Sequence, residues 1–216
     1  MIFRNHPISG TQLPPSSSII DDINTMHKSG SASLAFHYFD FRDTKNNELC
    51  GFLSSLLFQL CNQSDSYYNA LSSLYSTHQN GTQSADDDAL LECLQDMLSS
   101  ANQAPVYLIL DALDECPNAL DTVSPREEVL IFVDNLVNLH LPNLRICLTS
   151  RPEVDIQDVL EPLGFHSISI DDEEGQKQDI LDYVRSFVLS DLRMRKWKEE
   201  DKELVIDVLS QKADGM

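Results

Sequence analysis

Apolar residues along this chain form compact blocks that alternate with stripes of helical spacing. The blocks from Leu34 to Phe41 and from Val106 to Leu110 are almost continuous, as in strands that are covered on both faces of a sheet. Two further blocks run from Leu144 to Leu148 and from His166 to Ile170. We predict a strand at each of the four blocks.

The segments between the blocks carry apolar residues every three or four positions, which predicts amphipathic helices with their stripes in the core. The stripes lie within 19–27, 49–60, 68–78, 90–98, 130–137, 180–188 and 204–209. A capping box, Ser124-Pro125-Arg126-Glu127, opens one helix. Strands and helices alternate, so we predict an α/β fold with a doubly wound, mostly parallel sheet, followed by C-terminal helices.

Three regions are expected along the 216 residues. Residues 1–15 show no periodicity and include Pro14 and Pro15, so we predict an irregular N-terminal arm there, in which the first strand of the sheet is absent or reduced to Met1–Arg4. We assign 16–172 to the α/β core and 173–216, which holds the last two stripes, to the start of a helical subdomain. The chain shows no internal repeat. From its last residues we expect that the sequence stops at a truncation point.

Charge and composition narrow the class of protein. With 35 acidic and 15 basic residues the formal net charge is −20, which opposes the electrostatics of nucleic-acid binding. The basic cluster within 193–198 is read as a solvated helix end. The sequence has no apolar run of about 18 residues and no secretion signal, so we expect no membrane partner and a cytoplasmic location. The five cysteines are widely spaced without a CxxC pair, which favours core residues over disulfides or zinc ligands.

Candidate chemistry follows the Val106 block, which ends abruptly in Asp111, with Asp114 and Glu115 just beyond. Ligands of open parallel sheets lie at the carboxyl ends of the strands, where Asp111 can hold Mg²⁺ and the next two acids can orient a water. Arg151 follows the Leu144 block, and its planar cation suits either a phosphate or a structural ion pair. We predict that Asp111 and Arg151 share one sheet edge.

Two alternatives remain for these acids. They can simply solvate a loop and cap the next helix. They can also belong to a two-metal nuclease or phosphatase, but such a site needs further acids to converge, for example Asp40 or Asp43, and no motif supports them.

Three segments together resemble the NACHT domains of the STAND class of P-loop NTPases, in the group similar to the nephrocystin N-terminal region. VYLILDALDEC resembles the Walker B segment, LAFHYFDFRDTKNNELCGFLSSLLFQL the second strand and its helix, and LRICLTSRPE the sensor strand. The resemblance implies a sheet of P-loop NTPase type and an ATP- or GTP-dependent switch that oligomerises for signalling. It also implies Mg²⁺ coordination by Asp111, support of the attacking water by Asp114 or Glu115, and a γ-phosphate contact by Arg151.

The phosphate-binding loop of that class is missing from the sequence. A P-loop needs G-x-x-x-x-G-K-[ST] before its helix, but Gln12 and Leu13 stand where Lys and Ser or Thr are expected, and Pro14 and Pro15 remove backbone donors. We therefore expect a fold truncated at its N-terminus with impaired nucleotide binding. The alternative is a nucleotide-free protein-interaction module, and for either reading the expected partners are other protein chains or further copies of this one.

Overall fold

The computed structural model describes residues 2–4, 15–43, 47–78, 81, 83–99, 104–118, 123–169, 174–191 and 193–212. The chain forms two compact units. The first comprises Met1–Phe3 and Leu13–Ser167, and the second comprises Arg4–Gln12 and Ile168–Met216.

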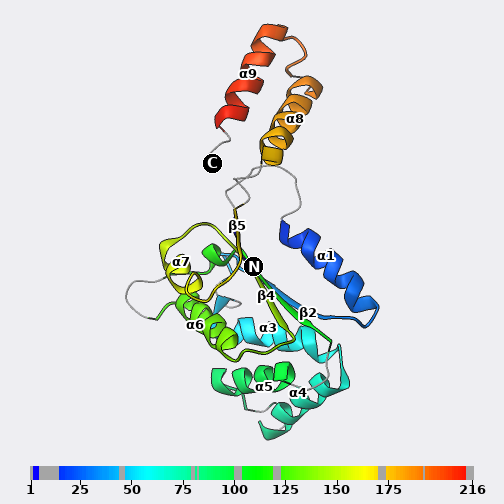
Figure 1. Ribbon diagram of the computed structural model, residues 1–216, viewed down its shortest axis with the longest axis vertical. Coiled ribbons are helices and arrows are strands. Elements are labelled where there is room, and N and C mark those ends of the chain that lie inside the picture. Colours follow the sequence, from blue (N-terminus) through cyan, green and yellow to red (C-terminus); the bar gives the residue numbers. More distant parts are fainter. Residues whose placement is uncertain are drawn as a thin grey trace. The chain divides into compact units, whose positions relative to one another are not determined.

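A parallel sheet organises the first unit (Figure 1). Its central strands are β2 (Ser33–Tyr38), β3 (Val106–Asp111) and β4 (Leu144–Ser150). β2 pairs with β3 from Ser33↔Val106 to Tyr38↔Asp111, and β3 pairs with β4 from Val106↔Leu144 onward, both parallel. The short strands β1 (Ile2–Arg4) and β5 (Ser167–Ser169) complete the order β2-β3-β4-β1-β5. The fold is therefore α/β, and the strands predicted at Leu34, Val106 and Leu144 are neighbours in the sheet.

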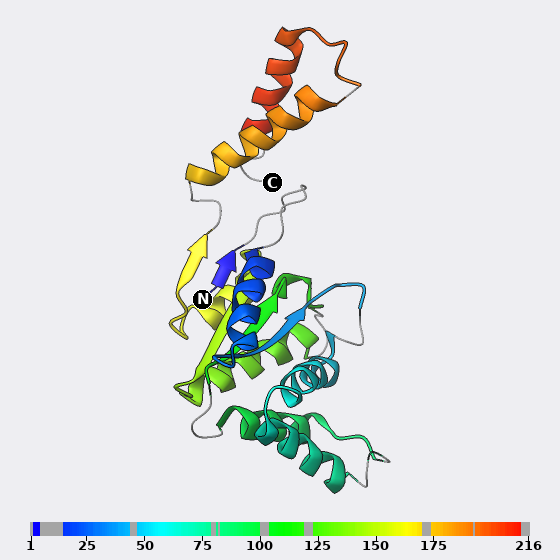
Figure 2. The same ribbon diagram turned by 90° about the vertical axis from the view of Figure 1, so that its right-hand side faces the viewer.

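Helices cover both faces of this sheet, as Figures 1 and 2 show. On one face lies α1 (Pro15–Lys28), whose Ile20 and Ile23 pack with Leu34 and Ile109 of the strands. The larger core lies on the other face, under α3 (Leu49–Cys61) and α6 (Pro125–Asn138). Alternate residues of β3 divide between these two cores, because side chains of a strand point to opposite faces. Burial on both faces explains why the sequence of β3 is continuously apolar.

Two further helices pack beyond α3. They are α4 (Asp65–Thr77) and α5 (Asp87–Ser99). Asp86 accepts a hydrogen bond from the Ala89 amide at the start of α5, at 3.0 Å. The same capping occurs at α6, where the Ser124 hydroxyl accepts from the Glu127 amide at 3.1 Å and Pro125 is the first helical residue. The N-terminus of α6 lies at the capping box that the sequence predicted.

The second unit contains two helices that pack against each other, α8 (Glu174–Ser190) and α9 (Glu199–Lys212). Among the described side chains of these helices, Val188 of α8 and Ile206 of α9 are the buried apolar ones. Arg185 and Glu203 form an exposed ion pair between the helices at 3.6 Å. The basic cluster lies between these helices, and Arg193 there is 85% exposed and paired with Asp191, which agrees with a solvated helix end.

Several predicted details differ from the structure. β2 ends at Tyr38 rather than Phe41 because the Asp40 carboxylate accepts a hydrogen bond from the Arg42 amide and turns the chain. In α4 the buried ring is Tyr67, whereas Tyr68 and Tyr75 are 62% and 54% exposed. A short helix, α7 (Val154–Leu160), was not predicted.

The N-terminal region also differs in part from its prediction. Ile2–Arg4 forms β1, within the Met1–Arg4 segment to which a first strand was expected to be reduced, whereas Pro15, expected in the irregular arm, already belongs to α1. The rest of the predicted arm, 5–14, lies outside the described residues.

Candidate functional site

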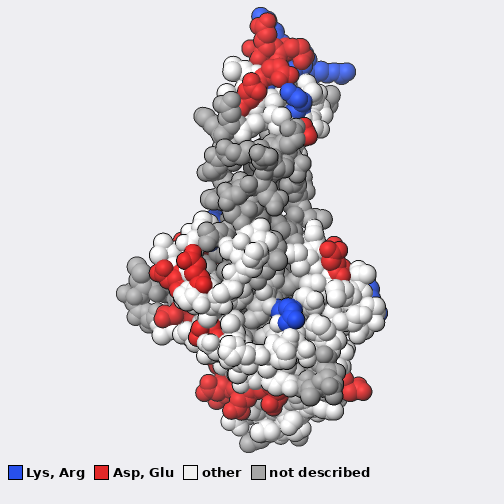
Figure 3. All heavy atoms as spheres, in the orientation of Figure 1, with Lys and Arg blue, Asp and Glu red and all other residues white. Residues whose placement is uncertain are grey.

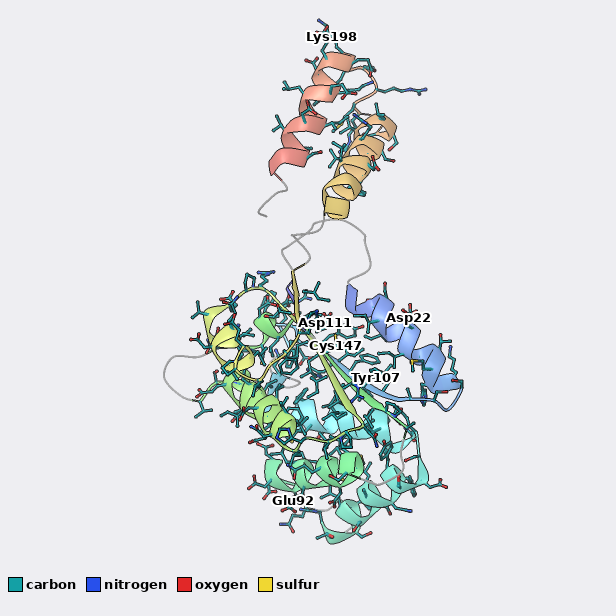
Figure 4. All side chains as sticks on the ribbon, viewed as in Figure 1. Asp22, Glu92, Tyr107, Asp111, Cys147 and Lys198 are labelled. Carbon is teal, nitrogen blue, oxygen red and sulfur yellow. The ribbon has the colours of Figure 1, made fainter. Side chains whose placement is uncertain are left out.

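Asp111 is the last residue of β3, the strand between β2 and β4 (Figure 4). It is 6% exposed, and its backbone oxygen accepts from the amide of Phe39 at 3.0 Å, just past the end of β2. Its carboxylate accepts a hydrogen bond from the Thr149 hydroxyl of β4. A buried carboxylate is thus held at the carboxyl edge of the sheet by a donor from the neighbouring strand.

The chain reverses direction immediately after Asp111. Ala112 has φ 55° and ψ 48° in the left-handed region, a strained conformation for a residue with a side chain. Its amide donates to Thr149 Oγ1 at 2.9 Å, so the Thr149 hydroxyl joins the strand end and the turn. A single helical turn follows, η2 (Leu113–Glu115), with Leu113 buried in the core.

Asp114 of this turn pairs with Arg151, which follows the end of β4. The Arg151 amide donates to Asp114 Oδ1 at 2.9 Å, and Arg151 Nε lies 3.4 Å from Asp114 Oδ2. The Asp114 side chain is 8% exposed and that of Arg151 is 50% exposed. Arg151 therefore forms the structural ion pair that its chemistry allowed, with a guanidinium that remains accessible to solvent.

A buried arginine of α6 also binds the backbone of this turn. Arg126 of α6 is 9% exposed. Its Nε donates to the backbone oxygen of Cys116 at 2.9 Å, and its Nη2 donates to the backbone oxygen of Asp114. Its remaining nitrogen, Nη1, pairs with Asp155 of α7 at 3.1 Å. We call the set of Arg126, Asp155 and the two backbone oxygens the arginine clamp.

The structure thus brings together Asp111, Asp114 and Arg151, as the sequence predicted, at one sheet edge. Glu115 lies on the same turn and is partly buried. Two further residues of the site, Thr149 and Arg126, were not predicted from the sequence. Thr149 directly follows the apolar block of β4. A polar residue directly after such a block is the same signal that identified Asp111 on β3. In the sequence Arg126 was predicted only as part of a capping box. Nothing in that pattern indicates that its side chain binds the turn that carries Asp114.

Cysteine chemistry is not favoured near this turn. Cys116 is fully buried, and burial raises the pKa of its thiol to about 12, although the Arg126 cation opposes the shift. Burial also raises the pKa of the Cys147 thiol on β4. Both side chains are therefore protonated near neutral pH and behave as small core residues.

Neither a metal cluster nor a membrane-spanning helix is found among the described residues. Within the described ranges, no group of three or more His, Cys, Asp or Glu side chains gathers in a way that could hold a metal ion, so the acids that a two-metal nuclease requires do not converge there. Acidic side chains collect instead over α5, away from the sheet edge (Figure 3). None of the helices described here is long and apolar enough to cross a membrane.

Comparison with known sequences places the chain in a family. The sequence model of the family "Nephrocystin 3, N-terminal" matches residues 15–151, a range that runs from the first residue of α1 to Arg151. The chain belongs to this family. No curated protein matches the chain significantly.

Proposed function

We propose that this member of the nephrocystin 3 N-terminal family is the core of a NACHT-like signalling switch in the cytoplasm. The switch binds a magnesium nucleotide weakly. It acts through contacts with other protein chains or with further copies of itself. The observation that carries the proposal is the buried Asp111 at the end of β3, which accepts a hydrogen bond from Thr149 of β4, together with the pair between Asp114 on the turn after β3 and Arg151 after β4. Open parallel sheets bind their ligands at this edge.

The chemistry of the edge fits a magnesium nucleotide in part. Mg²⁺ binds through one or two carboxylates and the phosphates of the nucleotide, and Asp111 with its Thr149 hydroxyl supplies such oxygens. Bound Mg²⁺ would neutralise phosphate charge. Arg151, half exposed, can exchange its contact with Asp114 for a phosphate, which would free the Asp114 carboxylate to orient a water.

The weakness of binding follows from the segment between β1 and α1, which has the sequence NHPISGTQLP in 5–14 and lies outside the described residues. It has no lysine and no G-K-[ST]. Each missing charge-assisted contact to phosphate removes roughly 1.5 kcal/mol or more. Loss of the lysine and at least two backbone donors removes about 4.5 kcal/mol, which is an affinity loss of about a thousandfold.

One observation favours a second candidate, a nucleotide-free interaction module. The charged groups of the edge already have protein partners, because Asp111 accepts from Thr149 and Asp114 pairs with Arg151. A site satisfied in this way needs no ligand to keep its turn in place.

Calorimetric titration with Mg-ATP and with Mg-GTP distinguishes the two candidates. We expect dissociation constants in the millimolar range for the unaltered chain, no binding for Asp111→Asn, and unaltered binding for Asp22→Asn, an exposed acid of α1. A micromolar constant would contradict the weak-binding account. Binding that is undetectable at millimolar nucleotide would favour the nucleotide-free module.

A further inference from the structure

β2 lies at one edge of the described sheet, where one of its sides pairs with β3. The backbone groups that point to β3 come from alternate residues, since Ser33 donates to Pro105 and Phe39 donates to Asp111. In a parallel strand the intervening residues direct both their N–H and their C=O groups to the opposite side. Leu34 and Phe36 therefore present backbone donors and acceptors to the open edge.

Two glutamine side chains take up these backbone groups, Gln59 from α3 and Gln63 from the turn that follows the last residue of α3, Cys61. Gln63 Oε1 accepts from the Leu34 amide at 2.9 Å, and Gln63 Nε2 donates to the Leu34 oxygen. Gln59 repeats the arrangement on Phe36, with its Oε1 accepting at 3.0 Å and its Nε2 donating at 2.7 Å. Each side-chain amide thus makes with one residue of β2 the pair of hydrogen bonds that a peptide group of a neighbouring strand would make.

The spacing of the two elements explains why two successive residues of β2 can be matched. Alternate residues of a strand are about 6.6 Å apart, and residues four apart on a helix rise by about 6 Å. Gln63 follows the end of α3, but its backbone amide donates to the Leu60 oxygen at 2.8 Å, so the turn extends the course of the helix by about this rise. Gln59 pairs with the later strand residue and Gln63 with the earlier one, so α3 runs opposite to β2. A helix in this direction can therefore set two glutamines against two consecutive open positions.

Both glutamine amides are fixed in orientation by further bonds. Gln59 Nε2 also donates to Ser55 Oγ at 3.2 Å, and Gln63 Nε2 also donates to the Gln59 backbone oxygen at 2.8 Å. Both side chains are partly buried, where a misplaced amide would be costly. We call Gln59 and Gln63 the glutamine clasp.

An open edge with the sequence of β2 is a site for unwanted pairing. Its six residues, SLAFHY, are largely apolar and include no charge or proline, and such an edge invites a further strand. The strand most available is β2 of another copy, present at equal concentration and able to pair about a two-fold axis. We propose that the glutamine clasp imitates a neighbouring strand and prevents β2 from pairing with β2 of a second copy.

Hydrogen exchange of the full chain tests the clasp directly. Methionine is nearly isosteric with glutamine and similar in helix propensity, but it cannot make these bonds. In Gln59→Met/Gln63→Met we expect exchange at the Leu34 and Phe36 amides to rise at least tenfold in dilute protein, while the amides of β3 stay protected. Gln63→Met alone should release only Leu34, and Gln95→Met on α5 should release neither.

Light scattering across a concentration series tests the consequence. The double variant should form dimers or larger species at concentrations where the unaltered chain and Gln95→Met keep a lower mass. The proposal is overturned if Leu34 and Phe36 stay protected in the double variant, or if they are released and its mass remains that of the unaltered chain. If the double variant does not fold, the same two criteria apply to Gln63→Met and to Gln59→Met singly.

Discussion

His37 of β2 lies among aromatic rings, 4.6 Å from Phe39 and 5.1 Å from Phe52 between ring centroids. Burial lowers its pKa to about 4, and the nearby Asp43 carboxylate only partly opposes this shift. The pKa in the folded chain is thus below the unfolded value of about 6.5. The neutral ring contributes stability that is fully present above pH 6.5 and is lost as the pH falls through 4.

We therefore expect the free energy of unfolding to fall by about 2 kcal/mol between pH 7 and pH 5 through His37. Urea titrations at the two pH values measure this, and His37→Phe should remove this part of the dependence. His166→Gln, at an exposed position, should leave it in place. Equal pH dependence in His37→Phe and the unaltered chain would refute the assignment.

Thr149 is fully buried and bonds both Asp111 and the Ala112 amide. Thr149→Val keeps its shape but leaves a buried carboxylate and an amide without this partner, so we expect a loss of about 2 kcal/mol in unfolding free energy. Thr149→Ser should retain most of the stability. Thr25→Val, at an exposed threonine of α1, is the matched control. A neutral effect of Thr149→Val in thermal unfolding would show that the hydroxyl does not hold the turn.

Single residues differ in how far the sequence reveals them. Asp111 was predictable because a charge directly after a continuous apolar run must lie at a strand end. The partner of Asp114 was not predictable, since Arg151 had the chemistry for a phosphate contact and for an ion pair alike. The glutamine clasp was missed because polar residues beside an apolar helix stripe have the pattern of a solvated face, and only the structure shows that they meet a strand edge.

The acidic turn depends on two helices through the arginine clamp. The Arg126 side chain is 11% exposed and bonds the backbone of the turn and Asp155. Arg126→Met keeps the apolar stem but leaves two backbone oxygens and a carboxylate without this donor. We expect a loss of about 3 kcal/mol, the lower end for breaking a buried pair, because Asp155 is partly exposed. Urea unfolding measures it.

The control for the arginine clamp is Arg145→Met, at an exposed position of β4, which should change stability by less than about 0.5 kcal/mol. The difference in unfolding free energy between the two variants isolates the contribution of the arginine clamp from the general effect of replacing an arginine by methionine. If Arg126→Met costs no more than the control, α6 and α7 do not hold the turn.

Helices and strands were predicted well where the apolar pattern extends over many residues. They were predicted less well where a single position decides which face of a helix is buried. The strands at Val106 and Leu144 and the capped helices α5 and α6 agree with the sequence within a few residues. In α4 the stripe was placed on Tyr68, but Tyr67 is the buried ring, because adjacent tyrosines satisfy the same pattern. In α9 the predicted stripe had Leu204, which is 63% exposed, whereas Ile206 is buried. A helix in a small unit buries few residues, so its apolar pattern is weak.

The whole chain divides into units of unequal size, and their boundary at Ser167/Ile168 lies close to the start of the helices that the sequence set apart. The first unit encloses a sheet between two helical layers. The second buries Val188 and Ile206 between two helices. Because helix pairs of this size have small cores, we infer that the second unit opens more readily than the first.

Ile206→Ala tests whether the two units open independently. Ile206 is fully buried, and its truncation removes apolar contacts worth roughly 2 kcal/mol or more, a large part of what a two-helix core can supply. We expect hydrogen exchange in α8 and α9 to accelerate at least tenfold, while the amides of β3, in the other core, keep their rates. Leu204→Ala on the same helix removes an exposed side chain and should change neither. If β3 accelerates together with α8 and α9, the chain unfolds as one cooperative body and the division into two units has no energetic meaning.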